Sequence, residues 1–193
     1  HVTTDFIACI DVDVAISDAT ISQLLPYFAD DKVALVAPRV KSRASTNFLG
    51  EYEVTASVLD MGESEARVCS GTRVSYVPSA MWLCRTTAVQ SVSGFDASLR
   101  SGEDVDMVWR LNNAGWRCRY QPQAECSHLP RATLQQFVQQ RMSYGESAAS
   151  LAKRHTGKLA PAKFNMWQAS TWLLVLLGMP FIALGVAVAS SAA

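Results

Sequence analysis

Near its beginning the sequence reads Asp5-Phe6-Ile7-Ala8-Cys9-Ile10-Asp11-Val12-Asp13. A short apolar run that ends at acidic residues is typical of a buried strand. A helix is expected from Ser17 or Asp18 to about Phe28, and a second buried strand over residues 33–37, ended by Pro38. Because strand, helix and strand follow one another closely, they form a βαβ unit. We therefore predict an α/β fold with a mixed, mainly parallel sheet.

The rest of the chain alternates further helices and short strands. Helices are expected over residues 49–60, 104–113 and 132–153, and strands over residues 74–77, 80–84, 116–120 and 124–127. Gly115 stands where the helix over 104–113 should end, since glycine is favoured directly after a helix. The helix over 132–153 is long and amphipathic.

Composition excludes some classes of protein. The 193 residues carry 17 Lys and Arg and 17 Asp and Glu, a net charge of zero that argues against a nucleic-acid binder and a disordered acidic chain. The balance is uneven, because residues 1–65 hold eleven acids and four bases and the remainder holds six acids and thirteen bases. Five cysteines, an odd number without a CxxC pair, argue against a disulfide framework and favour a reducing compartment.

The C-terminal stretch lacks charge from residue 164 to residue 193. As one helix, residues 167–189 would measure about 34 Å, which is enough to cross a bilayer. We therefore expect a transmembrane helix that is kinked at Pro180. The alternative is a helix buried in a protein core. Residues 131–163 hold six bases and one acid, which favours the cytoplasmic side of the membrane for the globular part. The expected organisation is a catalytic part at 1–130, a basic juxtamembrane helix and linker at 131–163 and a membrane segment at 164–193.

Asp11-Val12-Asp13 is the first candidate site. In an extended strand both carboxylates would point to one face, with Val12 turned back into the core. Strand ends of this kind bind ligands in open α/β sheets, and paired carboxylate oxygens suit Mg²⁺ or Mn²⁺ held together with a phosphate-bearing substrate. The alternative is an ordinary acidic loop after a strand.

Gly102-Glu103-Asp104-Val105-Asp106 is the second candidate site. Acidic residues are favoured in the first turn of a helix, so capping alone could explain them. The functional alternative is that Glu103 or Asp104 lies at the mouth of the same cleft, where a carboxylate can act as general base. Asp106 is expected to have a structural role.

Two further residues could have either a functional or a structural role. His128 could be a ligand or a structural histidine. Arg141, on the long basic helix, could bind a diphosphate through its guanidinium or be one more surface base.

The ordered set of motifs is more specific than any member. A strand ending in Asp11-Val12-Asp13, then Ser93-Gly94-Phe95-Asp96, then the Gly-Glu-Asp-Val-Asp-Met-Val-Trp-Arg-Leu run from Gly102, then Gly115-Trp116 and His128, resembles the family 2 glycosyltransferases of the GT-A fold. The resemblance covers about residues 5–150. Within that family, residues 102–120, the run 141–149, and residues 154–155 and 159–161 look like the mycofactocin-system glycosyltransferases.

The resemblance implies an inverting transfer of a sugar from a nucleotide-sugar donor to a peptide-derived or glycan acceptor. Asp11 and Asp13 would hold the donor diphosphate through a divalent cation, Mg²⁺ or Mn²⁺, and His128 would supply a further metal or phosphate contact. Asp104 would be the general base, and Glu103 would shape the acceptor site. In this family the strands that bind the nucleotide base come before the strand that ends at Asp11-Val12-Asp13. We therefore expect residues 1–193 by themselves to be inactive.

Other functions stay open. Processive synthases of the same fold carry a Gln-x-x-Arg-Trp motif. Here Val138 stands at the position of the Gln and Met142 at the position of the Trp, which argues against polymer synthesis. A membrane polysaccharide or glycolipid synthase is nevertheless the nearest alternative. Glycoside hydrolysis by Asp13 and Asp104, and a non-catalytic membrane protein that binds a divalent ion, are alternatives from other classes.

Overall fold

The computed structural model describes residues 2–43, 48–129, 133–159 and 166–191. The chain forms two compact units, His1–Leu159 and Ala160–Ala193.

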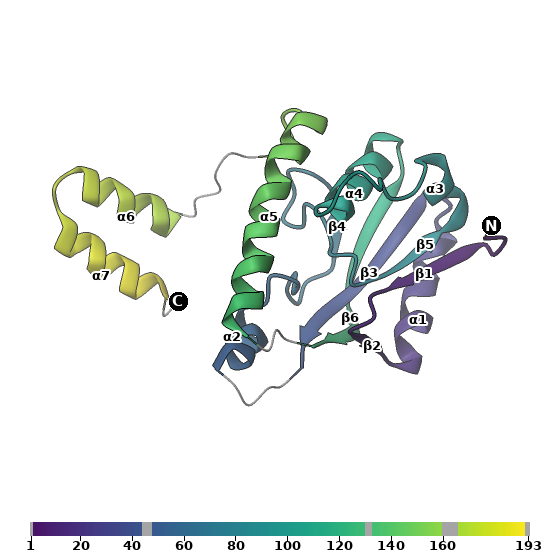
Figure 1. Cartoon of the computed structure of the whole chain (residues 1–193), viewed down its shortest axis with the longest axis horizontal. Helices are drawn as coiled ribbons and strands as arrows, with labels where there is room; N and C mark the ends of the chain where they lie inside the picture. Colours follow the sequence, from purple (N-terminus) through teal and green to yellow (C-terminus); the bar gives the residue numbers. More distant parts are fainter. Residues whose placement is uncertain (1, 44–47, 130–132, 160–165, 192–193) are drawn as a thin grey trace. The chain divides into compact units, whose positions relative to one another are not determined.

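A mixed six-stranded sheet forms the centre of the described part of the first unit, with strand order β1-β5-β3-β6-β2 and β4 paired to β6 (Figure 1). The strands are β1 (Phe6–Ile10), β2 (Val14–Ile16), β3 (Val33–Ser42), β4 (Ala66–Val68), β5 (Met81–Arg85) and β6 (Arg117–His128). Of the strand pairs among the described residues, only β3 and β6 run parallel, so the prediction of a mainly parallel sheet is wrong. The reason is β5, which lies between β1 and β3 and runs antiparallel to both.

Prolines interrupt the long strands less than the sequence suggests. Strand β3 continues through Pro38, and β6 is one strand of 12 residues rather than two short ones. The register passes from Pro38 opposite Gln121 to Arg39 opposite Glu125, so β6 bulges at Pro122. A bulge leaves residues out of the ladder, and a proline without an N–H is therefore tolerated there.

Helices cover both faces of the sheet. They are α1 (Asp18–Leu24), the 3₁₀ helix η1 (Leu25–Ala29), α2 (Phe48–Ala56), α3 (Thr86–Ser91), α4 (Glu103–Asn113) and α5 (Leu134–Arg154). Alternate residues of β3 supply two cores, because successive side chains of a strand point to opposite faces. Leu35 packs with Val108 of α4, whereas Val36 packs in the core that contains Leu24 and Phe28. Gly115, with φ +87°, follows α4 as predicted.

The second unit is a hairpin of two short helices, α6 (Met166–Leu176) and α7 (Pro180–Ser191), which pack side by side (Figure 1). The prediction of one helix over residues 167–189 is therefore wrong. The chain reverses at Gly178, whose φ is +74°, and Pro180 begins the next helix because it cannot continue the previous one. Among the residues that the structure describes, we find no helix that combines the length and the apolarity needed to cross a membrane.

Candidate active site

The Asp11–Asp13 stretch is a tight turn between β1 and β2. The Asp11 amide donates to the Ala80 carbonyl at 3.0 Å, and the Val14 amide donates to the Asp11 carbonyl at 3.1 Å. Val12 at the tip of the turn is fully exposed. The expectation of an extended strand with Val12 in the core is therefore wrong, and a turn rather than strand alternation presents the two carboxylates.

His128 is joined to this turn by the sheet. Strand β2 pairs with the end of β6 so that Val14 lies opposite His128, and His128 Nε2 lies 3.1 Å from an Asp13 carboxylate oxygen. The His128 side chain is buried, and within the described part of the chain its Nδ1 has no hydrogen-bond partner. The sheet thus brings together two predicted site residues that lie far apart in the sequence.

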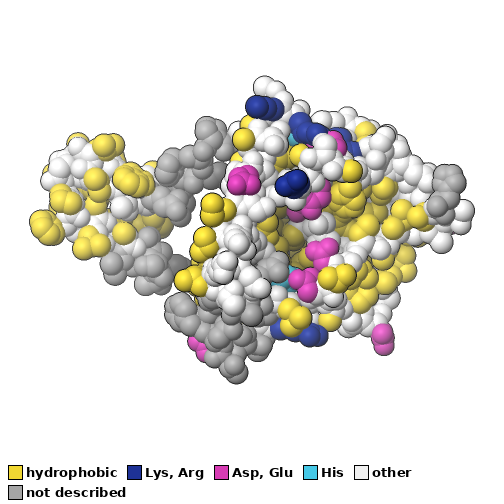
Figure 2. All heavy atoms as spheres, viewed as in Figure 1, with side chains coloured by type: hydrophobic (Ala, Val, Ile, Leu, Met, Phe, Trp, Pro, Cys, Tyr) yellow, Lys and Arg dark blue, Asp and Glu magenta, His cyan; other side chains and the backbone are white. Residues whose placement is uncertain are grey.

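Asp11 lies in an acidic environment. Burial raises its pKa above the usual range, and the neighbouring Asp13 carboxylate raises it further, while His128 acts in the opposite direction. Glu103 also raises the pKa of Asp11, which means that the start of α4 is close enough to repel it. Figure 2 shows acidic side chains and a histidine gathered in a hollow between α5 and the sheet. The start of the second acidic motif therefore lies near the Asp11 carboxylate.

Asp104 has the properties of a proton acceptor. Burial raises the pKa of its carboxyl to about 6, and the Glu103 charge adds to that effect. The amides of Val105, which donates to Asp104 Oδ1 at 2.7 Å, and of Ser79 act in the opposite direction. A carboxylate with a pKa near 6 is mostly ionised at neutral pH and still basic enough to take a proton from a substrate.

Asp106 is almost fully buried. Its two oxygens are bound by different partners: Arg110 Nε at 2.7 Å and His155 Nε2 at 2.8 Å. The buried charge is thus compensated by one residue of its own helix and one residue that follows α5.

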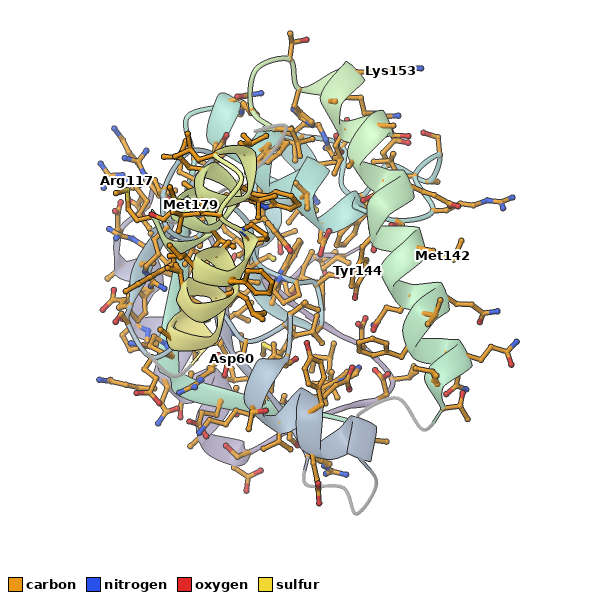
Figure 3. The ribbon with its side chains drawn as sticks, turned by 90° about the vertical axis from the view of Figure 1, so that its left-hand side faces the viewer. Asp60, Arg117, Met142, Tyr144, Lys153 and Met179 are labelled. Carbon is orange, nitrogen blue, oxygen red and sulfur yellow. The ribbon has the colours of Figure 1, made fainter. Side chains whose placement is uncertain are left out.

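Helix α5 borders the site from the other side. Ser101, just before the acidic motif, donates through its Oγ to the Ser143 carbonyl at 3.0 Å. Figure 3 shows Tyr144 pointing toward the body of the first unit, whereas Met142 and Lys153 point away from it. The side chain of Arg141 lies outside what the structure describes, so its contact with a diphosphate stays a prediction.

The loop before β5 is a part of the site that the sequence does not indicate. Its Ser79 amide binds Asp104, and its Ala80 carbonyl binds the Asp11 amide, so this loop connects the two acidic motifs. The only local signal is Pro78-Ser79, which marks a turn before a predicted strand. Such a signal predicts a turn but does not predict which other segments the backbone of the turn will contact.

The predicted metal ligands are close but do not form a complete coordination set. Among the described residues no three His, Cys, Asp or Glu side chains are arranged to hold a metal ion. His128 instead binds Asp13 directly. The roles of Asp11, Asp13 and His128 as metal ligands therefore stay predictions.

The chain is similar to known proteins of one family. The family model described as "Glycosyltransferase like family 2" matches residues 1–144. A pre-mycofactocin glycosyltransferase of Mycobacterium tuberculosis is 44% identical over 91% of this chain, and a poly-beta-1,6-N-acetyl-D-glucosamine synthase of Staphylococcus aureus is 23% identical over 78% of it. The chain spans 38% and 36% of the lengths of these two relatives.

A solved structure has the same fold. The mannosyltransferase of Pyrobaculum calidifontis, in complex with GDP-Man and Mn²⁺, matches all of this chain and 52% of its own with a TM-score of 0.56 and 14% identity. At that identity the match supports the fold, which is the GT-A glycosyltransferase fold. The chain therefore belongs to the glycosyltransferase-like family 2.

Proposed function

We propose that this chain carries the catalytic acids of an inverting glycosyltransferase, which moves a sugar from a nucleotide-sugar donor to an acceptor hydroxyl. One observation supports this most: Glu103, at the start of α4, lies close enough to the Asp11–Asp13 turn to raise the pKa of Asp11, and the adjacent Asp104 has a pKa of about 6. Paired carboxylates on one side and a proton acceptor on the other are what such a transfer requires.

The donor side fits a divalent cation. The pKa of Asp11 is raised mainly by burial and further by the neighbouring Asp13 carboxylate, and the hard oxygens of two such carboxylates suit Mg²⁺ or Mn²⁺. We assign Asp11 and Asp13 to the cation, with His128 as a further ligand or phosphate contact and Arg141 toward the diphosphate. A bound cation would stabilise the negative charge that grows on the departing nucleoside diphosphate.

The acceptor side supplies the base. The acceptor oxygen attacks the anomeric carbon of the sugar, the bond from that carbon to the diphosphate oxygen breaks, and the acceptor proton passes to Asp104. Because one base lies opposite one leaving group, a single displacement inverts the anomeric centre. Glu103, beside Asp104, is assigned to shaping the acceptor site.

For the acceptor we propose a peptide-derived molecule, as the name of the pre-mycofactocin relative suggests. A polysaccharide or glycolipid synthase is the second candidate, because the synthase from Staphylococcus aureus shares the family. The much higher identity to the first relative favours the peptide-derived acceptor.

We further propose that the protein is attached to a membrane, with the catalytic part on the cytoplasmic side. The support is the charge-free α6–α7 hairpin, whose apolar side chains are widely exposed, and the basic run that precedes it.

The test is a screen of the full-length protein against nucleotide sugars with Mn²⁺ or Mg²⁺, with release of nucleoside diphosphate as the readout. We expect release with one donor type, loss of release in EDTA, and a rate at least about 100-fold lower in Asp104→Asn. Hydrolysis that persists in EDTA would favour a glycoside hydrolase instead. Calorimetric binding of Mn²⁺ without any nucleoside diphosphate binding would favour a non-catalytic ion-binding protein.

A further inference from the structure

One side of α5, together with His155 just after it, lies along the start of α4. Ser143, Ser147, Leu151 and His155 recur at intervals of four residues, which places them on one side of a helix. We call these four residues the α5 face and residues 101–106 the acidic segment. Each member of the α5 face contacts the acidic segment or lies against its glycine.

The approach of Ser147 and Leu151 to the acidic segment depends on the absence of a side chain at Gly102. Gly102 has φ +79°, and a Cβ atom there would lie 2.9 Å from Leu151 Cδ1 and 3.0 Å from Ser147 Cβ. Only glycine allows the helix to approach the backbone this closely. The hydrogen bond from Ser101 Oγ to the Ser143 carbonyl, at 3.0 Å, lies directly beside this approach.

The last contact is a buried hydrogen bond between side chains. His155 and Asp106 are 7% and 1% exposed, and His155 Nε2 lies 2.8 Å from Asp106 Oδ1. The His155 ring also packs edge-on against Trp109 of α4, with ring centres 5.1 Å apart. Removing His155 would leave one oxygen of a buried carboxylate with only the more distant Arg154, 3.8 Å away.

We propose that the α5 face is a positioning device for Asp104, in which the buried His155–Asp106 contact holds the acidic segment at the angle that proton transfer requires. This inference rests on the proposed function, in which Asp104 is the base. Asp104 and Asp106 lie two residues apart in the first turns of α4, so a shift at Asp106 moves Asp104. The same contacts hold α5, which carries Tyr144 on the side that points toward the body of the unit.

The test compares three variants of the full-length protein: His155→Ala, His155→Gln and Ser150→Ala. Glutamine keeps an N–H that can donate to Asp106, and Ser150 is an exposed residue of the same helix. We expect kcat to fall about 10- to 100-fold in His155→Ala with the donor KM within about twofold of wild type, because a misplaced base slows the reaction without weakening donor binding. His155→Gln should recover most of kcat, and Ser150→Ala should match wild type.

Hydrogen exchange measured on the same proteins tests the positioning role of the α5 face independently of the proposed function. We expect peptides that contain residues 101–106 to exchange several-fold faster in His155→Ala, while peptides around Asp11 keep their wild-type rates. If wild type transfers no sugar, the proposed function is wrong, and the exchange of residues 101–106 alone then supports or overturns the positioning role.

Two results would overturn the proposal: an unchanged kcat in His155→Ala with a lower unfolding temperature, or unchanged exchange over the acidic segment. If His155→Ala does not fold, Ser101→Ala removes only the hydrogen bond to Ser143 and gives a milder test. It should lower kcat about two- to fivefold with the same local exchange pattern. Wild-type kcat and exchange in that variant would equally overturn the proposal.

Discussion

Asp104 shows at the scale of one residue how the fold changes the acidity of a carboxyl group. Its half-buried carboxyl lies at the start of a helix, next to Glu103, and burial is the largest cause of its raised pKa. A raised pKa means that the folded protein binds this proton more tightly than the unfolded chain does. The contribution of Asp104 to stability therefore grows as the pH falls through about 6 toward the unfolded value of 3.8, whereas the reaction needs the ionised form.

The pH dependence of transfer tests this role. Because only the ionised carboxylate accepts a proton, we expect kcat/KM to fall about tenfold for each pH unit below about 6. The measurement is a profile of nucleoside diphosphate release between about pH 4.5 and 8. Asp104→Asn should be slow and lack this acid limb, and Asp18→Asn, at an exposed acid in α1, should retain it. An acid limb of unchanged position in Asp104→Asn would assign the titration to another group.

At the scale of the element, the junction between α4 and α5 depends on Gly102. Gly102→Ala adds the strain of a left-handed backbone, about 1–2 kcal/mol, and a collision with Ser147 and Leu151 that costs about 1–3 kcal/mol more. Gly115→Ala, at the other end of α4, shares the positive φ but has no atom within 4 Å of the added Cβ. It is therefore the matched control for backbone strain alone.

Chemical denaturation and transfer rates together distinguish these two variants. We expect Gly102→Ala to lower the free energy of unfolding more than Gly115→Ala does, and to lower kcat as well, because α5 must move away from the acidic segment. Gly115→Ala should leave kcat near wild type. Equal effects of both variants on kcat would contradict a role for the close approach of α5.

At the scale of the whole molecule, the chain combines a sheet-centred unit with a charge-free helical hairpin. In α7, Phe181 and Leu184 are among the exposed apolar side chains, which is unusual for a hairpin that is surrounded by water. The proposed membrane attachment explains this exposure.

Partition into anionic lipid vesicles tests the attachment. A charge at the bilayer centre costs about 2.5–3.5 kcal/mol, so the double variant Phe181→Glu/Leu184→Glu of the full-length protein should bind vesicles at least about tenfold more weakly. Leu25→Glu, at an exposed leucine of η1, is the control and should bind like wild type. Unchanged binding of the double variant would show that the hairpin does not attach the protein to lipid.

The sequence by itself determined much of the local structure and indicated candidate residues for a site. Helix α4 begins and ends within one residue of its predicted bounds, since periodicity, first-turn acids and Gly115 are local signals. The two acidic motifs and His128 could be identified because carboxylates at strand ends and helix starts have a restricted set of uses. Their order along the chain also indicated the family.

Only the tertiary structure decided which segments meet. Strand direction depends on where β5 enters the sheet, and the continuity of β6 depends on its pairing with β3 across a bulge, so neither follows from a local pattern. The helix break at Gly178 and the contact of His155 with Asp106 likewise do not follow from the local sequence, which allows other structures at both places. A sequence pattern reports the environment that a residue prefers, whereas the partner that supplies this environment is set by packing of the whole chain.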